Sequence, residues 1–235
     1  MKRAEIVEFY RRLADRTPSP ETELEFVNHY TLLVAVVLSA QATDAGVNLA
    51  TRALFKDVNT PAAMVALGEE RLKDHIKTIG LFNTKAKNVI ALSEALLRDH
   101  GGEVPADLDA LQALPGVGRK TANVVMNCAF GAETFAVDTH VFRVSNRTGL
   151  APGKDVLAVE RGLDAVTPPP YRRDAHHLLI LHGRYVCKAR KPECWRCPVA
   201  DLCRFEPKTP PPGVEAGAKA PPRRRPVPAR APKPR

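Results

Sequence analysis

The chain has 235 residues, 44% of them apolar, and a formal net charge of +9. This length suffices for one large domain or two small ones with a hydrophobic core. The longest apolar run, 32–38, is too short for a membrane span, which needs about 20 residues. No apolar stretch of the kind that marks a secretory signal follows Met1. We therefore expect a soluble, intracellular protein.

Helical periodicity runs along most of the chain, and no stretch alternates apolar and polar residues long enough to require a strand. We therefore expect an all-α fold. The expected helices lie near 3–15, 23–40, 44–56, 61–67, 69–78, 84–99, 107–113, 119–130, 139–147, 154–166 and 171–185.

Capping residues mark several ends of these helices. Thr60 followed by Pro61 is typical of an N-cap with proline at the first helical position. Four glycines follow periodic runs, where a left-handed residue ends a helix. These are Gly80, Gly101, Gly131 and Gly149.

The composition changes after about Glu206. Residues 207–235 contain eight basic residues, one acidic residue and ten of the 21 prolines. The other 206 residues are nearly neutral, with 27 basic against 25 acidic residues. The segment has too few large apolar side chains to offset its ordering entropy, so we expect a disordered Pro/Arg-rich basic tail.

Four of the five cysteines fall within 17 residues, in the spacing C-x6-C-x2-C-x5-C. This pattern suits a metal site in a reducing cytosol better than disulfides, and it leaves zinc and a 4Fe–4S cluster equally open. The cysteines are Cys187, Cys194, Cys197 and Cys203. Lys188, Arg190 and Lys191 lie between the first two, where they either contact phosphate or solvate a surface loop.

A glycine hairpin, LPGVG at 114–118, precedes the expected helix 119–130. Gly116 and Gly118 let the backbone turn tightly, and amides at a helix N-terminus favour a phosphate. An ordinary helix connection is the alternative. Lys120 lies in the first helical turn beside Arg119, and it becomes nucleophilic if burial and like charges remove its proton. Otherwise it is a surface lysine that contacts phosphate.

Three other polar residues have conventional structural explanations. Asp138 follows an apolar pair and is expected to cap the next helix, although a carboxylate near Lys120 could also take its proton. Cys128 shares a helix face with apolar residues and is expected to be a buried thiol. His182 shares an apolar face with Leu178 and is expected in the core.

Taken in order, the motifs resemble the endonuclease III family of helix–hairpin–helix DNA glycosylases. The resemblance covers about residues 3–206. It rests on LSAQATD at 38–44, IGL at 79–81, LPGVGRKTA at 114–122, VDTH at 137–140 and the cysteine spacing. Together, in one chain and in this order, these motifs are highly specific.

The resemblance implies a six-helix domain over 21–132 and a second domain, formed by 1–20 and 133–206, around a 4Fe–4S cluster. It implies that the four cysteines hold this cluster and that DNA lies between the domains. By position, Lys120 is the amine nucleophile and Asp138 the assisting carboxylate. Gln41 and Leu81 would fill the gap left by a flipped nucleotide. The residues that would grip phosphate are Gly116, Val117, Gly118 and Arg119.

The implied activity is base excision repair by a DNA glycosylase that also cuts DNA as an AP lyase. A lysine Schiff base would remove oxidised pyrimidines, and β-elimination would cut the strand 3′ of the abasic site. The partner would be double-stranded DNA containing damaged pyrimidines or abasic sites. The resemblance further implies a monomer that acts in the cytoplasm at the nucleoid, with no membrane association.

Two features depart from the family pattern. The tail is one, and we expect it either to add salt-sensitive DNA affinity or only to aid solubility. Trp195, inside the Cys194–Cys197 pair, is bulkier than the pattern and is expected to alter cluster solvation.

Two other functions are alternatives to a glycosylase that is also an AP lyase. A monofunctional adenine glycosylase would lack a lysine at position 120 and would carry a folded C-terminal domain. A noncatalytic DNA-binding helix–hairpin–helix module would not need Lys120 together with Asp138.

Overall fold

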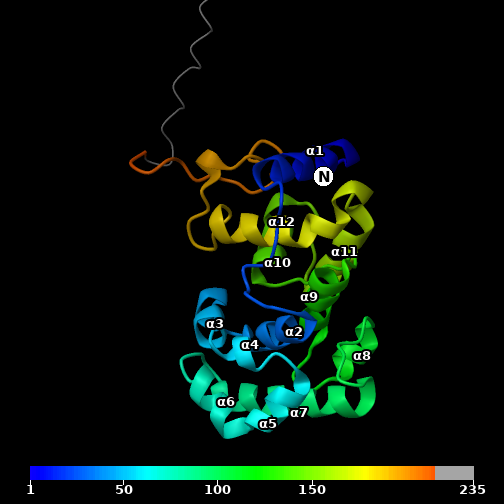
Figure 1. The fold of residues 1–235 in the computed structure, drawn as a ribbon. Coiled ribbons are helices and arrows are strands. Elements are labelled where there is room, and N and C mark those ends of the chain that lie inside the picture. Colours follow the sequence, from blue (N-terminus) through cyan, green and yellow to red (C-terminus); the bar gives the residue numbers. More distant parts are fainter. Residues whose placement is uncertain (215–235) are drawn as a thin grey trace, which may run out of the picture.

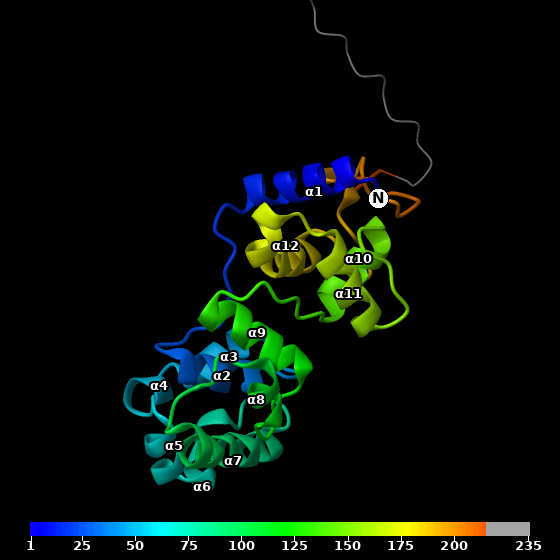
Figure 2. The ribbon, with the colours of Figure 1, turned by 90° about the vertical axis from the view of Figure 1, so that its right-hand side faces the viewer.

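A computed structural model describes residues 1–214 as a two-lobed assembly of helices, without strands in that range (Figures 1 and 2). The all-α expectation is confirmed. The helices are α1 (Arg3–Arg16), α2 (His29–Leu38), α3 (Asp44–Thr51), α4 (Leu54–Asp57), α5 (Pro61–Leu67), α6 (Glu69–Ile76), α7 (Phe82–His100), α8 (Leu108–Ala113), α9 (Arg119–Phe130), α10 (Thr139–Thr148), α11 (Val156–Val166), η1 (Pro169–Tyr171), α12 (Arg172–Tyr185) and η2 (Cys194–Arg196).

Two separate hydrophobic cores organise these helices. One contains buried residues between 24 and 136, from α2 to α9, and α2 is buried almost all round. The other combines α1 with residues 135–199, so the first helix of the chain packs against its last helices. Figure 2 shows α1, α10, α11 and α12 in one lobe and α2 to α8 in the other, with α9 at the junction.

Two expected helices differ markedly from the observed ones, and the others agree to within two residues at each end. The helix expected at 23–40 begins only at His29, because the Asn28 side chain caps α2 by accepting a hydrogen bond from the Thr31 N–H at 2.9 Å. Ahead of it, the chain is held by Asn48, whose side chain bonds the backbone of Glu23 and Glu25. The helix expected at 44–56 is split into α3 and α4.

Most capping expectations are confirmed. The Thr60 hydroxyl accepts from the Ala63 N–H, with Pro61 at the first helical position. Gly101, Gly131 and Gly149 all have positive φ at helix C-termini. The expectation for Gly80 is wrong, because the left-handed residue is its neighbour Leu81, at φ 60°.

Only the first part of the expected tail lies in the described range, and residues 215–235 lie outside it. Lys208 is anchored, since its ammonium donates to the backbone oxygens of Cys203 and Phe205 at 2.9 and 2.5 Å. The expectation of a disordered tail over 207–235 stays a prediction. Among residues 1–214, no helix is long and apolar enough to cross a bilayer.

Candidate active site

Lys120 lies at the junction between the two lobes. It lies in the first turn of α9, whose N-cap is Gly118 at the end of the hairpin. The residue is exposed in the free protein. Its side chain lines a cavity of about 70 Å3 that Asp138 also lines. The structure thus brings these two residues to one space.

Asp138 is held in a fixed position by the start of α10. Its Oδ1 accepts hydrogen bonds from the N–H groups of His140 and Val141, each at 2.8 Å. The expected N-cap is therefore confirmed. Because the residue is half-buried and lines the cavity, its carboxylate is oriented beside the space that Lys120 faces.

The rest of the cavity wall comes from both lobes. The segment before α2, the ends of α2 and α3, and the inner face of α12 contribute. These residues are Glu21, Thr22, Glu23, Leu24, Val36, Ser39, Asp44, Val124, His176, His177, Ile180, Leu181 and Arg184. Arg184 links the lobes, since its guanidinium contacts Asp44 at 2.9 Å and also pairs with Glu23. The cavity therefore has many polar lining residues, and it lies where Arg184 joins the two lobes.

His176 is the residue of this cavity that sequence reasoning missed. It is 2% exposed, and its ring meets that of His177 edge-on at 5.0 Å between centroids. Burial lowers the pKa of His176 to about 3, with His177 and Lys120 contributing. A signal was available, because His176 precedes Leu179, Ile180 and Gly183 at helical spacing. A histidine on the inner face of α12 could have been inferred from it.

The hairpin has the left-handed turn that its glycines suggested. Gly116 has φ 76°, and a Cβ built there would lie 2.9 Å from the Asn88 side chain. Gly118 has open space around the corresponding position. Val117 is buried, and its N–H already donates to the Leu114 carbonyl at 3.1 Å. Of the hairpin residues expected to grip phosphate, Val117 thus has a structural role in the turn.

The cations expected to contact DNA differ in their present partners. Arg119 pairs with Glu160 of α11 at 2.6 Å, and this contact raises the pKa of Arg119. Lys188 pairs with Glu193 at 2.7 Å. Arg190 and Lys191 are exposed on the same loop.

Gln41 and Leu81 share an unusual backbone conformation. With φ of 54° and 60°, they are the non-glycine residues of positive φ in the described chain. Their loops are adjacent, since a Cβ built at Gly80 would lie 3.9 Å from the Gln41 carbonyl oxygen. Both residues are exposed, Leu81 by 57%. Such conformations cost about 1–3 kcal/mol each and are found mostly at functional sites.

The four clustered cysteines line one cavity, next to the C-terminal parts of α10 and α12. Its lining also includes His182, which is buried as expected and has its Nε2 3.7 Å from the Cys197 Sγ. Burial raises the pKa of Cys197 to about 11 and also raises that of Cys203. Cys128 is separate and half-buried, with its Sγ 3.6 Å from the His177 Nε2.

Four thiols around one cavity fit an iron–sulfur cluster. Within residues 1–214, no three His, Cys, Asp or Glu side chains are close enough to hold a single metal ion. A 4Fe–4S cluster binds each thiolate to a different iron, so its ligands lie farther apart than those of one ion. The cationic irons would stabilise thiolates that burial alone disfavours. Trp195 is 48% exposed and does not line this cavity, and its expected effect on cluster solvation stays a prediction.

Two arginines of α10 hold the start of the cysteine loop. Arg143 donates to the carbonyl oxygens of Cys187 and Gly183, at 2.9 and 2.8 Å. Arg147 donates to the carbonyl oxygens of Lys188 and Ala189, both at 2.7 Å, and its Nη1 lies 3.7 Å from the Cys187 Sγ. The helix that Asp138 caps therefore also supports the first cysteine.

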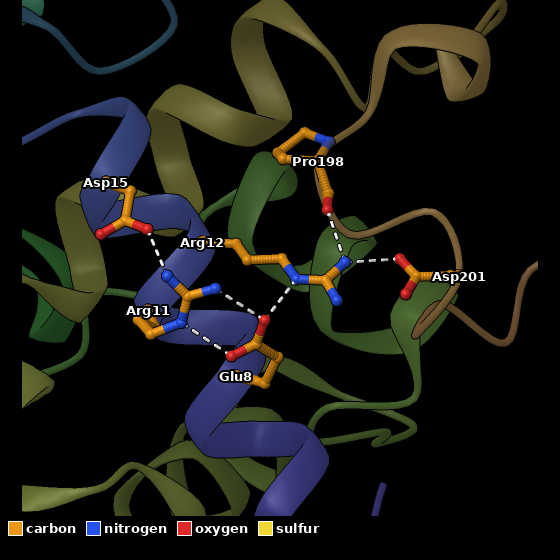
Figure 3. Close-up of polar contacts among 6 residues, drawn as sticks. All are labelled: Glu8, Arg11, Arg12, Asp15, Pro198 and Asp201. Carbon is orange, nitrogen blue, oxygen red and sulfur yellow. Dashed lines mark hydrogen bonds and ion pairs between the residues drawn. The ribbon is translucent and has the colours of Figure 1, made fainter. Parts of the chain in front are cut away.

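The other end of the cysteine loop is held by α1 (Figure 3). Arg12 donates to the Pro198 carbonyl oxygen at 3.0 Å and to Asp201 at 2.6 Å. Its Nε also donates to the Glu8 carboxylate, at 2.7 Å. The neighbouring Arg11 binds Glu8 and Asp15 within α1. A hydrogen bond between residues that are 186 positions apart in the sequence thus joins α1 to the cysteine loop.

Comparison with known proteins identifies the family. Residues 34–169 match the HhH-GPD superfamily base excision DNA repair protein family. Residues 187–203 match the iron–sulfur binding domain of endonuclease III. The cofactor is therefore a 4Fe–4S cluster.

Individual relatives agree with these matches. Endonuclease III of Escherichia coli (strain K12) is 57% identical over 208 residues, which cover 88% of this chain and 99% of that protein. Endonuclease III of Haemophilus influenzae is 55% identical with the same coverage. Among solved structures, a trapped endonuclease III–DNA covalent intermediate aligns with a TM-score of 0.82 at 45% identity, covering 87% of this chain and 96% of that one. The chain therefore belongs to the HhH-GPD superfamily of base excision DNA repair proteins and, within it, to the endonuclease III family of DNA glycosylases.

Proposed function

We propose that this glycosylase also cuts DNA as an AP lyase, acting on oxidised pyrimidines and abasic sites in double-stranded DNA. The observation that carries the proposal is that Lys120 and Asp138 line one cavity between the lobes. An amine and an oriented carboxylate in one space are what lysine Schiff-base chemistry needs.

DNA would lie across the hairpin and the mouth of this cavity. Two of the solved structures that this chain resembles are endonuclease III–DNA complexes. Gly116 and Gly118 would bring the backbone close to a phosphate at the N-terminus of α9. Arg119 would exchange Glu160 for a phosphate, and Lys188, Arg190 and Lys191 would add contacts from the cysteine loop.

A damaged base has to leave the helical stack before Lys120 can reach its sugar, and weak pairing of the lesion lowers the cost. We assign Gln41 and Leu81 to the gap that the flipped nucleotide leaves. Their strained conformations hold two exposed side chains on adjacent loops, which supports an insertion role.

The first step would exchange the base for the lysine. The lone pair of Lys120 Nζ attacks C1′ of the sugar, and the glycosidic C1′–N bond breaks with its electron pair leaving on the base, which is then protonated. Before the attack, Asp138 takes a proton from the Lys120 ammonium, and it then gives this proton to the departing base, so that its restored carboxylate stabilises the positive charge on the sugar. The ring then opens: the C1′–O4′ bond breaks as one proton passes from the new C1′-bound nitrogen to O4′, which gives a protonated Schiff base.

The second step would cut the strand. The iminium acidifies the C2′ proton, which a base removes. The electron pair forms a C2′–C3′ double bond, and the C3′–O bond breaks with the 3′ phosphate as leaving group. Water then hydrolyses the Schiff base and releases Lys120.

We further propose that the lobes correspond to a domain over 21–132 and a domain formed by 1–20 and 133–206, acting as a monomer. Cys187, Cys194, Cys197 and Cys203 would be the cluster ligands, since all four line one cavity. When bound, the cluster supplies four iron–thiolate bonds that hold the basic loop 188–191 in place.

Borohydride trapping tests the proposed function. The protein is mixed with a duplex containing one oxidised pyrimidine, and sodium borohydride is added to reduce any Schiff base to a stable adduct. We expect a covalent protein–DNA adduct from the wild type and none from Lys120→Ala.

Other outcomes would overturn specific parts of the proposal. Adducts from both proteins would mean that another amine reacts. Base release without an adduct or strand cutting would indicate a monofunctional glycosylase. Binding with neither adduct nor release, on a panel of lesions, would favour a noncatalytic module.

A further inference from the structure

Most buried polar side chains in the described chain have a hydrogen-bond partner, and the exceptions are few. Three atoms lack one: Lys85 Nζ, Ser145 Oγ and His176 Nδ1. A buried polar atom left unpaired costs about 1–3 kcal/mol, so each needs an explanation. Of the three residues, only His176 lines the cavity of Lys120 and Asp138.

We propose that His176 is a base-recognition residue, whose Nδ1 hydrogen-bonds the flipped-out base when it occupies this cavity. This assignment rests on the proposed function, because it requires a base to enter the space that Lys120 faces. It goes further by naming a residue that distinguishes a nucleotide with a base from an abasic one.

The position of His176 matches this role. The residue is 2% exposed, belongs to α12 and lines the cavity together with Lys120 and Asp138. Its neighbour His177 already has a partner, since its Nε2 lies 3.6 Å from the Cys128 Sγ. His177 thus supports the His176 ring edge-on, and Nδ1 of His176 is left for a ligand.

The charge state of His176 also suits a base. Burial and the nearby Lys120 keep its pKa near 3, so the imidazole is neutral at pH 7 and cannot accept the Lys120 proton to any useful extent. A neutral imidazole has one donor and one acceptor nitrogen, and a pyrimidine base presents both kinds of group on its polar edge.

Comparing base release with abasic-site cutting tests this assignment. His176→Leu has a similar size but no polar atom, and His176→Asn places an amide near the position of Nδ1. On a duplex with an oxidised pyrimidine, we expect His176→Leu to slow single-turnover base release by about 10- to 100-fold, the value of one buried hydrogen bond. On a duplex with an abasic site, which offers no base, we expect strand cutting at the wild-type rate.

Two further variants make the comparison specific. His176→Asn should recover most of the base release. Ser145→Ala removes a buried hydroxyl that also lacks a partner but lies on α10 outside the cavity. This control should leave both rates unchanged. If His176→Leu slows both reactions equally or neither, or if asparagine recovers nothing, the assignment is wrong.

A measurement on the wild type covers the case in which His176→Leu does not fold. The 15N shift of the His176 ring is followed on binding a duplex with a noncleavable lesion nucleotide or a noncleavable abasic analogue. We expect the Nδ1 signal to move only with the base-bearing duplex, and equal shifts would refute the role. A wild type that neither releases bases nor cuts abasic sites would refute the proposed function itself.

Discussion

Asp138 combines a structural and a chemical role in one carboxyl group. Both amide hydrogen bonds that start α10 go to Oδ1, and an asparagine carbonyl can accept them equally well. The negative charge, in contrast, is needed only beside Lys120. Substitution can therefore separate the helix cap from the proposed chemistry.

We predict that Asp138→Asn keeps the wild-type melting temperature, while base release falls by about 100-fold or more. Asp138→Ala should lose the cap as well, which costs about 1 kcal/mol and lowers the melting temperature by about 2–4 °C. Thermal melting and single-turnover excision would be measured on both variants. Base release by Asp138→Asn at the wild-type rate would show that this residue acts only as a helix cap.

At the scale of elements, the hairpin offers a matched pair of glycines. Gly116 needs its positive φ and approaches Asn88, whereas Gly118 has an ordinary φ of −87° and no atom within 4 Å of a built Cβ. One glycine is thus required by the fold, and the other is free to meet a ligand.

Gly116→Ala should therefore destabilise the protein by roughly 1–3 kcal/mol through backbone strain, with crowding at Asn88 adding to it. Gly118→Ala should melt like the wild type but bind duplex DNA more weakly, because its methyl group projects where a phosphate would approach. Melting curves and titration with a labelled duplex would check both. A melting temperature of Gly118→Ala below that of the wild type would contradict the assignment of Gly118 to ligand binding rather than to the fold.

The sequence predicted elements better than the contacts between them. Caps such as Thr60 and Gly149 were visible because their physics is local. The late start of α2 was not, because the segment before it is held by Asn48, which lies 23 and 25 residues after the two residues it bonds. The pairing of Arg119 with Glu160 and the unpaired Nδ1 of His176 depend on packing between distant helices, which spacing along one helix cannot reveal.

At the scale of the whole molecule, α1 and the cysteine loop form one unit although they lie at opposite ends of the described chain. Arg12 reaches across to Pro198 and Asp201, whereas Arg11 binds only within its own helix among the contacts of Figure 3. The two arginines are adjacent in sequence and differ in what they join.

We predict that Arg12→Met accelerates loss of the cluster several-fold, because the Pro198–Asp201 segment between Cys197 and Cys203 is no longer held. Arg11→Met should lose the cluster at the wild-type rate. Decay of the visible absorption of the cluster under air would measure both. Equal decay in the two variants would show that α1 does not support the loop.

The packing of α1 against the other end of the chain also constrains how the protein is made. Its apolar face, with Ile6, Phe9, Tyr10 and Leu13, is synthesised long before its partners in the second core, which extend to Val199. At about 5–20 residues per second, this helix waits roughly 10–40 s on the ribosome before its core can close. The core of α2 to α9 is complete well before then, so the nascent chain has one folded lobe and one exposed apolar helix. Chaperone binding during synthesis should therefore concentrate on the apolar face of α1, and it should end only when residues up to Val199 have emerged.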